Sequence, residues 1–296
     1  MNSRRKILLT AVAAGTSLLL AVPPSSAQQA QPAPPLTAEQ AAKIVASPDR
    51  SAADLTNDRR RKPEEMLVFI GVRPGMTTLD LSAAGGYTTE LLARAIGPSG
   101  MVYGQSRPRD PSRPPTPPAA PEGNSNPTAT SGTAVVAPAP PAAAPRPSPD
   151  ALEARSRALT NAGIEAAPIA AVVLPFESPV PPELPEFDLV TLMFNYHDLG
   201  HLGVDRAAMN RAVFQALKKG GFYVIADHSG RPGTGISEAG TLHRVEEAFL
   251  RKEVEAAGFK LAAEGNFLRN PKDPRDKNTP DPPQPKDDFV FKFVKP

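Results

Sequence analysis

The stretch that decides the fold reads Met76-Thr-Thr-Leu-Asp-Leu-Ser-Ala-Ala-Gly-Gly-Tyr-Thr-Thr-Glu-Leu-Leu92, in a chain of 296 residues. Residues 78–81 form a short apolar run, which is typical of a buried parallel strand. Small residues fill positions 82–86, and apolar residues then recur at helical spacing from Leu91. A turn without bulky side chains lets a ligand approach the backbone, and the helix behind it offers free N–H groups. The stretch therefore predicts the opening βαβ unit of a nucleotide-binding domain.

Strands and helices alternate through the rest of the chain. Further strands are expected at 100–105, 170–174, 187–194 and 222–226, and helices at 37–46, 64–70, 150–162, 204–217 and 243–257. The helix at 37–46 opens with Thr37-Ala-Glu-Gln40, which has the spacing of a capping box. Two strands, 259–267 and 289–294, then follow one another without a helix between them. This order predicts an α/β fold with a Rossmann-like, mostly parallel sheet of seven strands and an antiparallel C-terminal strand pair.

The first 27 residues have the organisation of an export signal. Arg4, Arg5 and Lys6 precede an apolar segment over 7–22, and small residues at 25–27 provide a cleavage site. The apolar segment is shorter than the roughly 20 residues that span a membrane, which favours a cleaved leader over a retained anchor. Residues 3–8 also resemble the twin-arginine signal, a route that carries folded proteins. The sequence thus predicts an exported, periplasmic protein with no membrane contact beyond this leader.

Charge and cysteine content exclude several functions. Removing the three basic residues of the leader takes the formal charge from +2 to −1. No basic stripe with interleaved aromatic residues is present, so nucleic acid is not a predicted partner. The absence of cysteine excludes disulfides, thiolate metal sites and cysteine nucleophiles. A small-molecule substrate is the expected partner.

A proline-rich segment interrupts the expected domain. Fourteen of the 37 prolines fall in residues 107–150, with almost no large apolar residue among them. Such a segment buries too little apolar surface to offset its ordering entropy, so a disordered insertion is expected there. The predicted organisation is a signal peptide over 1–27, a linker and N-terminal helix over 28–62, and one domain over 63–296 that contains the insertion.

The turn after the first strand resembles the first motif of class I S-adenosylmethionine-dependent methyltransferases. On that alignment Asp80 is the motif acid and Gly86 the last glycine, while Ser82 and Ala84 stand where the family usually has glycine. In this family an acid at the end of the second strand binds the ribose hydroxyls, and Gln105 occupies that position here. The resemblance implies S-adenosylmethionine as the cofactor. The residues implied to bind it are Asp80, Ser82, Ala83, Ala84, Gly85, Gly86, Tyr87, Gln105 and Asn195.

Other motifs extend this resemblance over about residues 63–295, apart from the insertion. Leu217-Lys-Lys-Gly-Gly-Phe-Tyr-Val-Ile225 resembles the family's turn before the fifth strand. Four further motifs together are similar to a bacterial, exported group of predicted methyltransferases: Asn195-Tyr-His-Asp-Leu199, Asp227-His228, Leu242-His-Arg244 and Leu268-Arg-Asn-Pro271. The basic run at 58–63 lies just ahead of the first strand. It is either a solvated face or part of the cover of the cofactor cleft.

Histidines gather where the chemistry of such a sheet takes place. Ligands of open α/β sheets bind outside the carboxyl ends of the strands. Of the four histidines, His197 follows the strand at 187–194 and His228 follows the strand at 222–226. Methyl transfer to a weak nucleophile needs a base in line with the acceptor. His197 or His228 is the candidate base, with Asp198 or Asp227 as its orienting partner.

The next segment supplies two more candidate site residues. His243 and Arg244 follow a glycine-rich loop over 230–240. They are candidates for closing over the site, with those glycines as hinges, or for holding an anionic substrate.

Two alternative functions stay open from the sequence. His and Asp pairs on neighbouring strand ends can also bind a divalent metal, as in a metal-assisted hydrolase or lyase. No HxxxH-type spacing is present, so no metal ligand is assigned and the metal is not favoured. The other alternative is an exported, non-catalytic ligand-binding protein on a degenerate methyltransferase fold. The replaced glycines of the turn and the export signal favour it, because S-adenosylmethionine is a cytosolic metabolite.

Overall fold

The computed structural model describes residues 33–109, 148–278 and 284–296. The expected signal peptide over 1–27 and most of the expected insertion, residues 110–147, lie outside the described residues. The described residues between Ala33 and Pro296 form one compact unit. Within the described ranges, no helix combines the length and the apolar character needed to cross a membrane.

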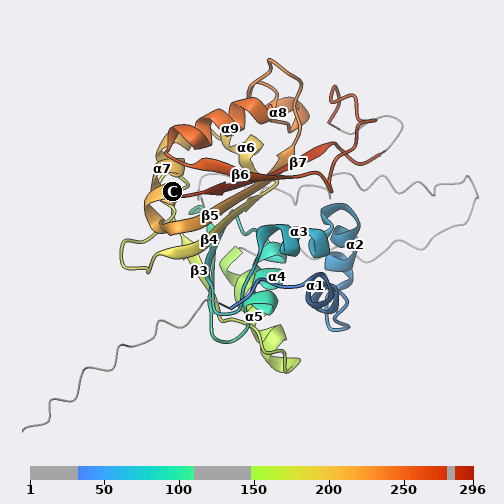
Figure 1. The fold of residues 1–296 in the computed structure, drawn as a ribbon, viewed down its shortest axis with the longest axis vertical. Helices are drawn as coiled ribbons and strands as arrows, with labels where there is room; N and C mark the ends of the chain where they lie inside the picture. The colour runs from blue at the N-terminus through green and yellow to red at the C-terminus, as the bar shows by residue number, and fades with distance from the viewer. Residues whose placement is uncertain (1–32, 110–147, 279–283) are drawn as a thin grey trace, which may run out of the picture. The chain divides into compact units, whose positions relative to one another are not determined.

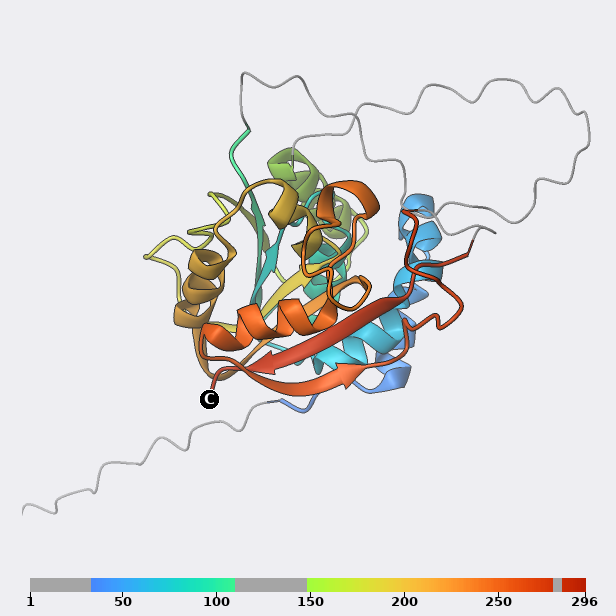
Figure 2. The same cartoon turned by 90° about the horizontal axis from the view of Figure 1, so that it is seen from above.

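Seven strands form one sheet in the order β3-β2-β1-β4-β5-β7-β6 (Figure 1). They are β1 (Thr77–Leu81), β2 (Met101–Ser106), β3 (Ile169–Val173), β4 (Phe187–Met193), β5 (Leu217–His228), β6 (Lys260–Gly265) and β7 (Asp288–Val294). β1 to β5 pair in parallel, and β7 is antiparallel to both of its neighbours, β5 and β6. Figure 2 shows β6 and β7 running side by side. The predicted Rossmann-like sheet with an antiparallel C-terminal pair is confirmed.

Helices cover both faces of the sheet (Figure 1). One hydrophobic core contains residues of α1 (Ala38–Val45), α3 (Pro63–Ile70), α4 (Tyr87–Ile96) and α5 (Ser148–Asn161). The other contains residues of α6 (Tyr196–His201), α7 (Arg206–Ala216) and α9 (Glu247–Ala256). Because both faces are covered, strand residues such as Leu79 and Val190 are completely buried. The carboxyl ends of β1, β4 and β5 are left as the place where polar side chains can meet.

The N-terminal segment belongs to the domain. The capping box of α1 is present, since the Thr37 hydroxyl accepts the N–H of Gln40 and the Gln40 side chain accepts the N–H of Thr37. Leu36 and Val45 pack in the same core as Leu92 of α4. The expected boundary between a linker and a domain at residues 62 and 63 is therefore not a structural boundary.

Three helices were not expected from the sequence. α2 (Ala52–Arg61) contains most of the basic run, α6 begins directly after β4, and α8 (Ala239–Leu242) interrupts the glycine-rich loop. α5 begins at Ser148, two residues before its expected start, so the end of the segment expected to be disordered is helical. Gly71, with φ of +73°, ends α3 at Ile70, where the helix expected over 64–70 also ends.

Candidate active site at the carboxyl ends of the strands

The turn after β1 adopts left-handed backbone conformations at residues that are not glycine. φ is +55° at Ser82 and +46° at Ala84, while Gly86, at +78°, is the N-cap residue of α4. A non-glycine residue in this region costs about 1–3 kcal/mol, and such strain concentrates at functional sites. The turn keeps the shape of a glycine-rich loop although two of its glycines are replaced.

Asp80 anchors the turn from below. Its side chain is buried, and its two carboxylate oxygens accept hydrogen bonds from the hydroxyls of Thr89 (2.7 Å) and Thr191 (2.8 Å). Burial raises the pKa of Asp80 to about 6, although the two hydroxyl donors favour the charged form. Asp80 thereby joins β1 to the first turn of α4 and to β4.

A cavity of about 460 Å³ opens above the turn and Asp80. We call it the central cavity; its walls come from α2, from the turn after β1 and from the residues that follow β4. The guanidinium of Arg61 lies over the rings of Phe194 (4.8 Å) and Tyr87 (5.2 Å), and that of Arg60 lies over Phe194 (5.4 Å). The basic run therefore covers the cleft, which is one of the two interpretations that the sequence allowed.

Most of the residues expected to bind the cofactor line the central cavity: Asp80, Ser82, Ala83, Ala84, Gly85, Tyr87 and Asn195. Gly86 lies behind its wall, where a Cβ would come within 2.7 Å of the Leu152 side chain of α5. Gln105 is also behind the wall and fully buried. Its Oε1 accepts the N–H of Ser82 (3.1 Å), and its Nε2 donates to the carbonyl of Leu174 (2.7 Å). Gln105 therefore supports the turn, and its amide is not available for the expected ribose contact.

His197 is held between two carboxylates. It is completely buried at the start of α6, and its Nδ1 lies 2.5 Å from Oδ1 of Asp227 at the end of β5. Its Nε2 lies 3.3 Å from Oδ1 of Asp198, in ion-pair contact but outside hydrogen-bond geometry. Burial alone would lower the pKa of His197, but the charges of Asp227 and Asp198 raise it to about 10. At neutral pH His197 is therefore an imidazolium, and the expected role of a free base does not fit it.

Asp198 connects this buried pair to the central cavity. It lines the cavity wall, its Oδ2 accepts from the Asn195 amide (3.0 Å), and its Oδ1 contacts Nδ1 of His243 (3.1 Å). Burial opposes ionisation, but the nearby positive charge of His197, together with His243, lowers the pKa of Asp198 below its ordinary value. His243 is one-third exposed and has φ of +50°, so it is accessible and held in a strained turn.

The other two histidines have different surroundings. His228 is buried, and its Nδ1 lies 2.6 Å from Oδ1 of Asp288 in β7. Its ring centroid is 5.4 Å from that of His197, so the two expected His/Asp pairs do lie together. His201 packs on Gly240, where a Cβ would lie 2.4 Å from its ring. The loop expected to act as a hinge is thus packed closely on α6.

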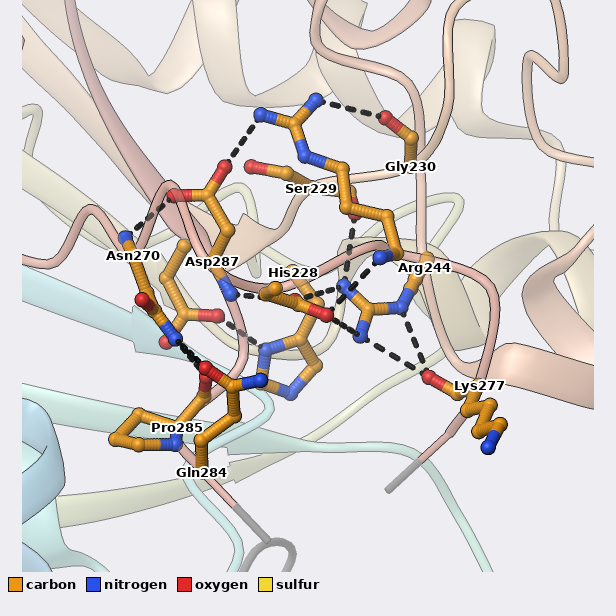
Figure 3. Close-up of polar contacts among 12 residues, drawn as sticks. His228, Ser229, Gly230, Arg244, Asn270, Lys277, Gln284, Pro285 and Asp287 are labelled. Atoms are coloured by element: carbon orange, nitrogen blue, oxygen red, sulfur yellow. Dashed lines mark hydrogen bonds and ion pairs between the residues drawn. The ribbon is translucent and has the colours of Figure 1, made fainter. Parts of the chain in front are cut away.

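Arg244 is not part of the cavity. Its side chain is completely buried, and its guanidinium donates to Asp273 (2.8 Å) and to the carbonyls of Ser229 (3.0 Å) and Lys277 (3.0 Å) (Figure 3). The expectation that Arg244 closes over the site or holds a substrate is therefore wrong. Its guanidinium instead links the end of β5 to the segment that precedes β7.

A second network of charges was not foreseen. Arg155 of α5 pairs with Asp54 of α2 (2.8 Å) and with Glu90 of α4, and it also donates to the carbonyl of Gly85. Asp54 and Arg155 both line the central cavity. Arg155 lies 101 residues from Asp54, so no local pattern could have indicated the pair.

The His/Asp cluster also has the proximity of a metal site. One atom each from His197, Asp198 and His243 lie within 4.8 Å of one another. In this structure the histidines contact carboxylates directly, with Nδ1 of His197 at 2.5 Å from Asp227 and Nδ1 of His243 at 3.1 Å from Asp198. We interpret the cluster as a hydrogen-bonded network and assign no metal ligand.

Neither a protein-family model nor a curated protein matches this chain. Solved structures match it at low identity. The S-adenosylmethionine-dependent methyltransferase from Aquifex aeolicus is 13% identical with a TM-score of 0.49, covering 88% of this chain and 100% of that chain. A TehB-like S-adenosylmethionine-dependent methyltransferase from Corynebacterium glutamicum is 15% identical with a TM-score of 0.43, covering 83% and 99%. Aeropyrum pernix fibrillarin, in complex with natively bound S-adenosyl-L-methionine, is 14% identical with a TM-score of 0.42, covering 75% and 68%. These likenesses concern the fold alone.

Proposed function

We propose that this protein is an S-adenosylmethionine-dependent methyltransferase for a small-molecule acceptor. One observation carries the proposal: the central cavity brings the strained turn at 82–86 and the Asp198–His243 pair to the same edge of the sheet. The turn offers backbone to a ligand, and the pair offers a site for a proton.

The residues of the cavity fit the cofactor in several respects. Its volume of about 460 Å³ falls within the range of small-molecule sites. The N-cap residue of α4 is Gly86, which has no side chain to cap the helix, so the positive end of the helix dipole faces the turn. Asp80 places a carboxylate beside a ligand that carries a positive sulfonium. The turn, Asp80 and Asn195 would hold the cofactor, which supplies an activated methyl group when bound.

Two residues of the chain, Asp198 and His243, are placed to accept the proton that the methyl acceptor loses. Asp198 is an ionised carboxylate on the cavity wall, so it can accept a hydrogen bond from the nucleophilic group of the acceptor. His243, in contact with the same carboxylate and open to solvent, can take the proton and release it. The buried imidazolium of His197 keeps Asp198 charged and in place.

The test combines binding with turnover. Calorimetric titration of the full chain with S-adenosylmethionine and its demethylated product should show binding of both, and a screen of small acceptors should then show transfer. Asp198→Asn and His243→Gln should keep binding and lose turnover by about 10²-fold or more, the usual contribution of a positioned proton acceptor. His201→Gln, a histidine substitution away from the cavity, should leave both unchanged.

Two results would contradict the proposal in different ways. A failure of the full chain to bind either cofactor form would exclude a methyltransferase. Binding without transfer to any acceptor, with Asp198→Asn no different from the unmodified chain, would favour the non-catalytic ligand-binding alternative.

A further inference from the structure

A second cavity, of about 390 Å³, lies between the end of α2 and the two segments that precede β7 in the chain. We call it the basic cleft. Six cationic residues line it, namely Arg59, Arg60, Lys62, Arg269, Lys272 and Lys286, and the one acid among its lining residues is Asp288. Asp288 is buried and is already paired with His228. The cleft therefore has a strong excess of positive charge.

Much of this charge lacks a counterion among the described residues. Arg59, Arg60, Lys62 and Lys272 form no ion pair with any described carboxylate, whereas Arg269 pairs with Glu247. Elsewhere in the described chain, arginines such as Arg50 and Arg94 are paired with Asp58 and Asp49. Like charges gathered around a concave surface repel one another, and this cost is relieved when an anion binds. The cleft is built as an anion site would be.

The wall of the cleft around Arg269 and Asn270 is fixed before any ligand arrives. The Asn270 amide donates to Gln284 (3.0 Å) and to the carbonyl of Pro285 (2.6 Å), and the Asn270 N–H donates to Asp287 (2.8 Å) (Figure 3). The guanidinium of Arg269 is held by Glu247 (2.6 Å). A site whose walls are already ordered loses little conformational entropy on binding, which favours affinity.

Arg60 connects the basic cleft with the central cavity, because its side chain lines both. Its guanidinium lies over Phe194, which belongs to the central cavity. Its Nη1 is buried and donates to no described acceptor. The charge of Arg60 therefore lies at the boundary of the two cavities without a carboxylate partner among the described residues. An anion in the cleft and a reacting group in the central cavity would thus share one wall.

We infer that the basic cleft binds the anionic group, a carboxylate or a phosphate, of the methyl acceptor. This inference rests on the proposed function. The anionic group is held by Arg59, Arg60 and Lys272, while the rest of the acceptor passes Arg60 and reaches Asp198. The anion thereby orients the nucleophile, and the acceptor is a small organic acid or phosphate ester.

The experiment titrates the full chain with inorganic phosphate and, separately, with acetate at low ionic strength, where charge is least screened. The double variant Arg59→Gln/Lys272→Gln removes two charges of the cleft and none of the central cavity. Arg211→Gln/Lys252→Gln removes the same two residue types from exposed positions of α7 and α9. Affinity for the better anion should fall at least about tenfold in the first variant, since two charge-assisted contacts are lost, and should stay unchanged in the second. Which anion binds more tightly distinguishes a phosphate from a carboxylate acceptor.

Equal weakening in both variants, or no binding of either anion, would overturn the inference. Titration with S-adenosylmethionine separates this failure from that of the proposed function. Retained cofactor binding without anion binding removes only the cleft assignment. If anion binding depends on Arg59 and Lys272 but the cofactor does not bind, the proposed methyltransferase function is contradicted. The basic cleft is then supported as an anion site by itself.

Discussion

Asp227 binds His197 at two points. Its Oδ1 accepts from the ring Nδ1–H at 2.5 Å, and its Oδ2 accepts from the backbone N–H at 2.8 Å. The same Oδ1 accepts the N–H of His228 at 2.8 Å. One buried carboxylate at the end of β5 thus fixes the first turn of α6 after β4. The pair acts as a brace under Asp198, the residue that reaches the cavity.

This relationship predicts how stability depends on pH. The folded pKa of His197, about 10, lies above its ordinary value of 6.5, so the pair stabilises the fold fully below pH 6.5 and loses that effect as the pH rises through 10. Asp227→Asn should cost roughly 3–5 kcal/mol at about pH 6, because it leaves a buried charge without its partner. The difference from the unmodified chain should shrink toward about pH 10. Denaturant unfolding at several pH values measures it. A difference that is constant with pH would show that His197 is not charged.

The left-handed turn predicts a stabilising substitution. Ala84→Gly should raise the midpoint of thermal unfolding by roughly 2–4 °C, since it relieves about 1 kcal/mol of backbone strain. It should also tighten S-adenosylmethionine binding, because a Cβ is removed from the exposed side of the turn. Ala83→Gly is the matched control: Ala83 is buried without positive φ, so the same change should destabilise the fold. A lower midpoint for Ala84→Gly would contradict the strain at this position.

Burial of Asp80 predicts a second dependence of folding stability on pH, which the Asp80→Asn variant should lack. The pKa of Asp80 is raised from the ordinary 3.8 to about 6, so ionisation costs the folded state stability as the pH rises through that window. Asp80→Asn cannot ionise. Its stability relative to the unmodified chain should therefore rise by roughly 3 kcal/mol between about pH 4 and pH 7. Cofactor affinity should fall in the same variant. Thermal unfolding across this range is the measurement, and a relative stability without pH dependence would contradict the burial effect.

Substituting Gly86 is expected to lower the free energy of unfolding through both backbone strain and close contact. In Gly86→Ala the new Cβ would meet Leu152 at 2.7 Å and Arg155 at 2.8 Å, in addition to the strain of a φ of +78°. Gly163→Ala, at φ of +67° with nothing within 4 Å, provides the strain alone. Gly86→Ala should be the more destabilising by roughly 1–3 kcal/mol, the usual cost of overpacking, as measured by denaturant unfolding. Equal effects would show that α5 moves aside freely.

The central strands could be predicted from the sequence because they contain apolar runs bounded by turn residues, whereas β5 begins at Leu217, five residues before its expected start. Thr77–Leu81 and Phe187–Met193 lie where the pattern placed them, and their order follows from the alternation with helices. α2 could not be predicted in this way. Its one large apolar residue, Leu55, is exposed. The helix is stabilised by the Ser51 cap, by the ion pair of Asp58 with the nearby Arg50 and by that of Asp54 with the distant Arg155.

The residue types at the site could be predicted from the sequence, but their hydrogen-bond partners could not. The sequence indicated that two His/Asp pairs gather at one edge, because parallel strands end there, but it left open whether Asp198 or Asp227 orients a histidine. Arg244 pairs with Asp273, and Gln105 accepts the N–H of Ser82. Both partners are distant in the sequence, so no local pattern indicated them. Local patterns therefore indicated which residue types gather, while the tertiary contacts decided which of them reach the cavity.

The position of β7 has a consequence for how the protein is made. Asp288–Val294 follows all other elements in the chain, yet it lies between β5 and β6, with a neighbour on each side. Until the ribosome has released these residues, β5 and β6 cannot be joined, and each presents an unpaired edge. The nascent chain must therefore keep two open strand edges apart until residues 288–294 have been made. A premature stop codon shortly before β7 would leave a split sheet prone to aggregation, even though every residue of the central cavity had already been translated.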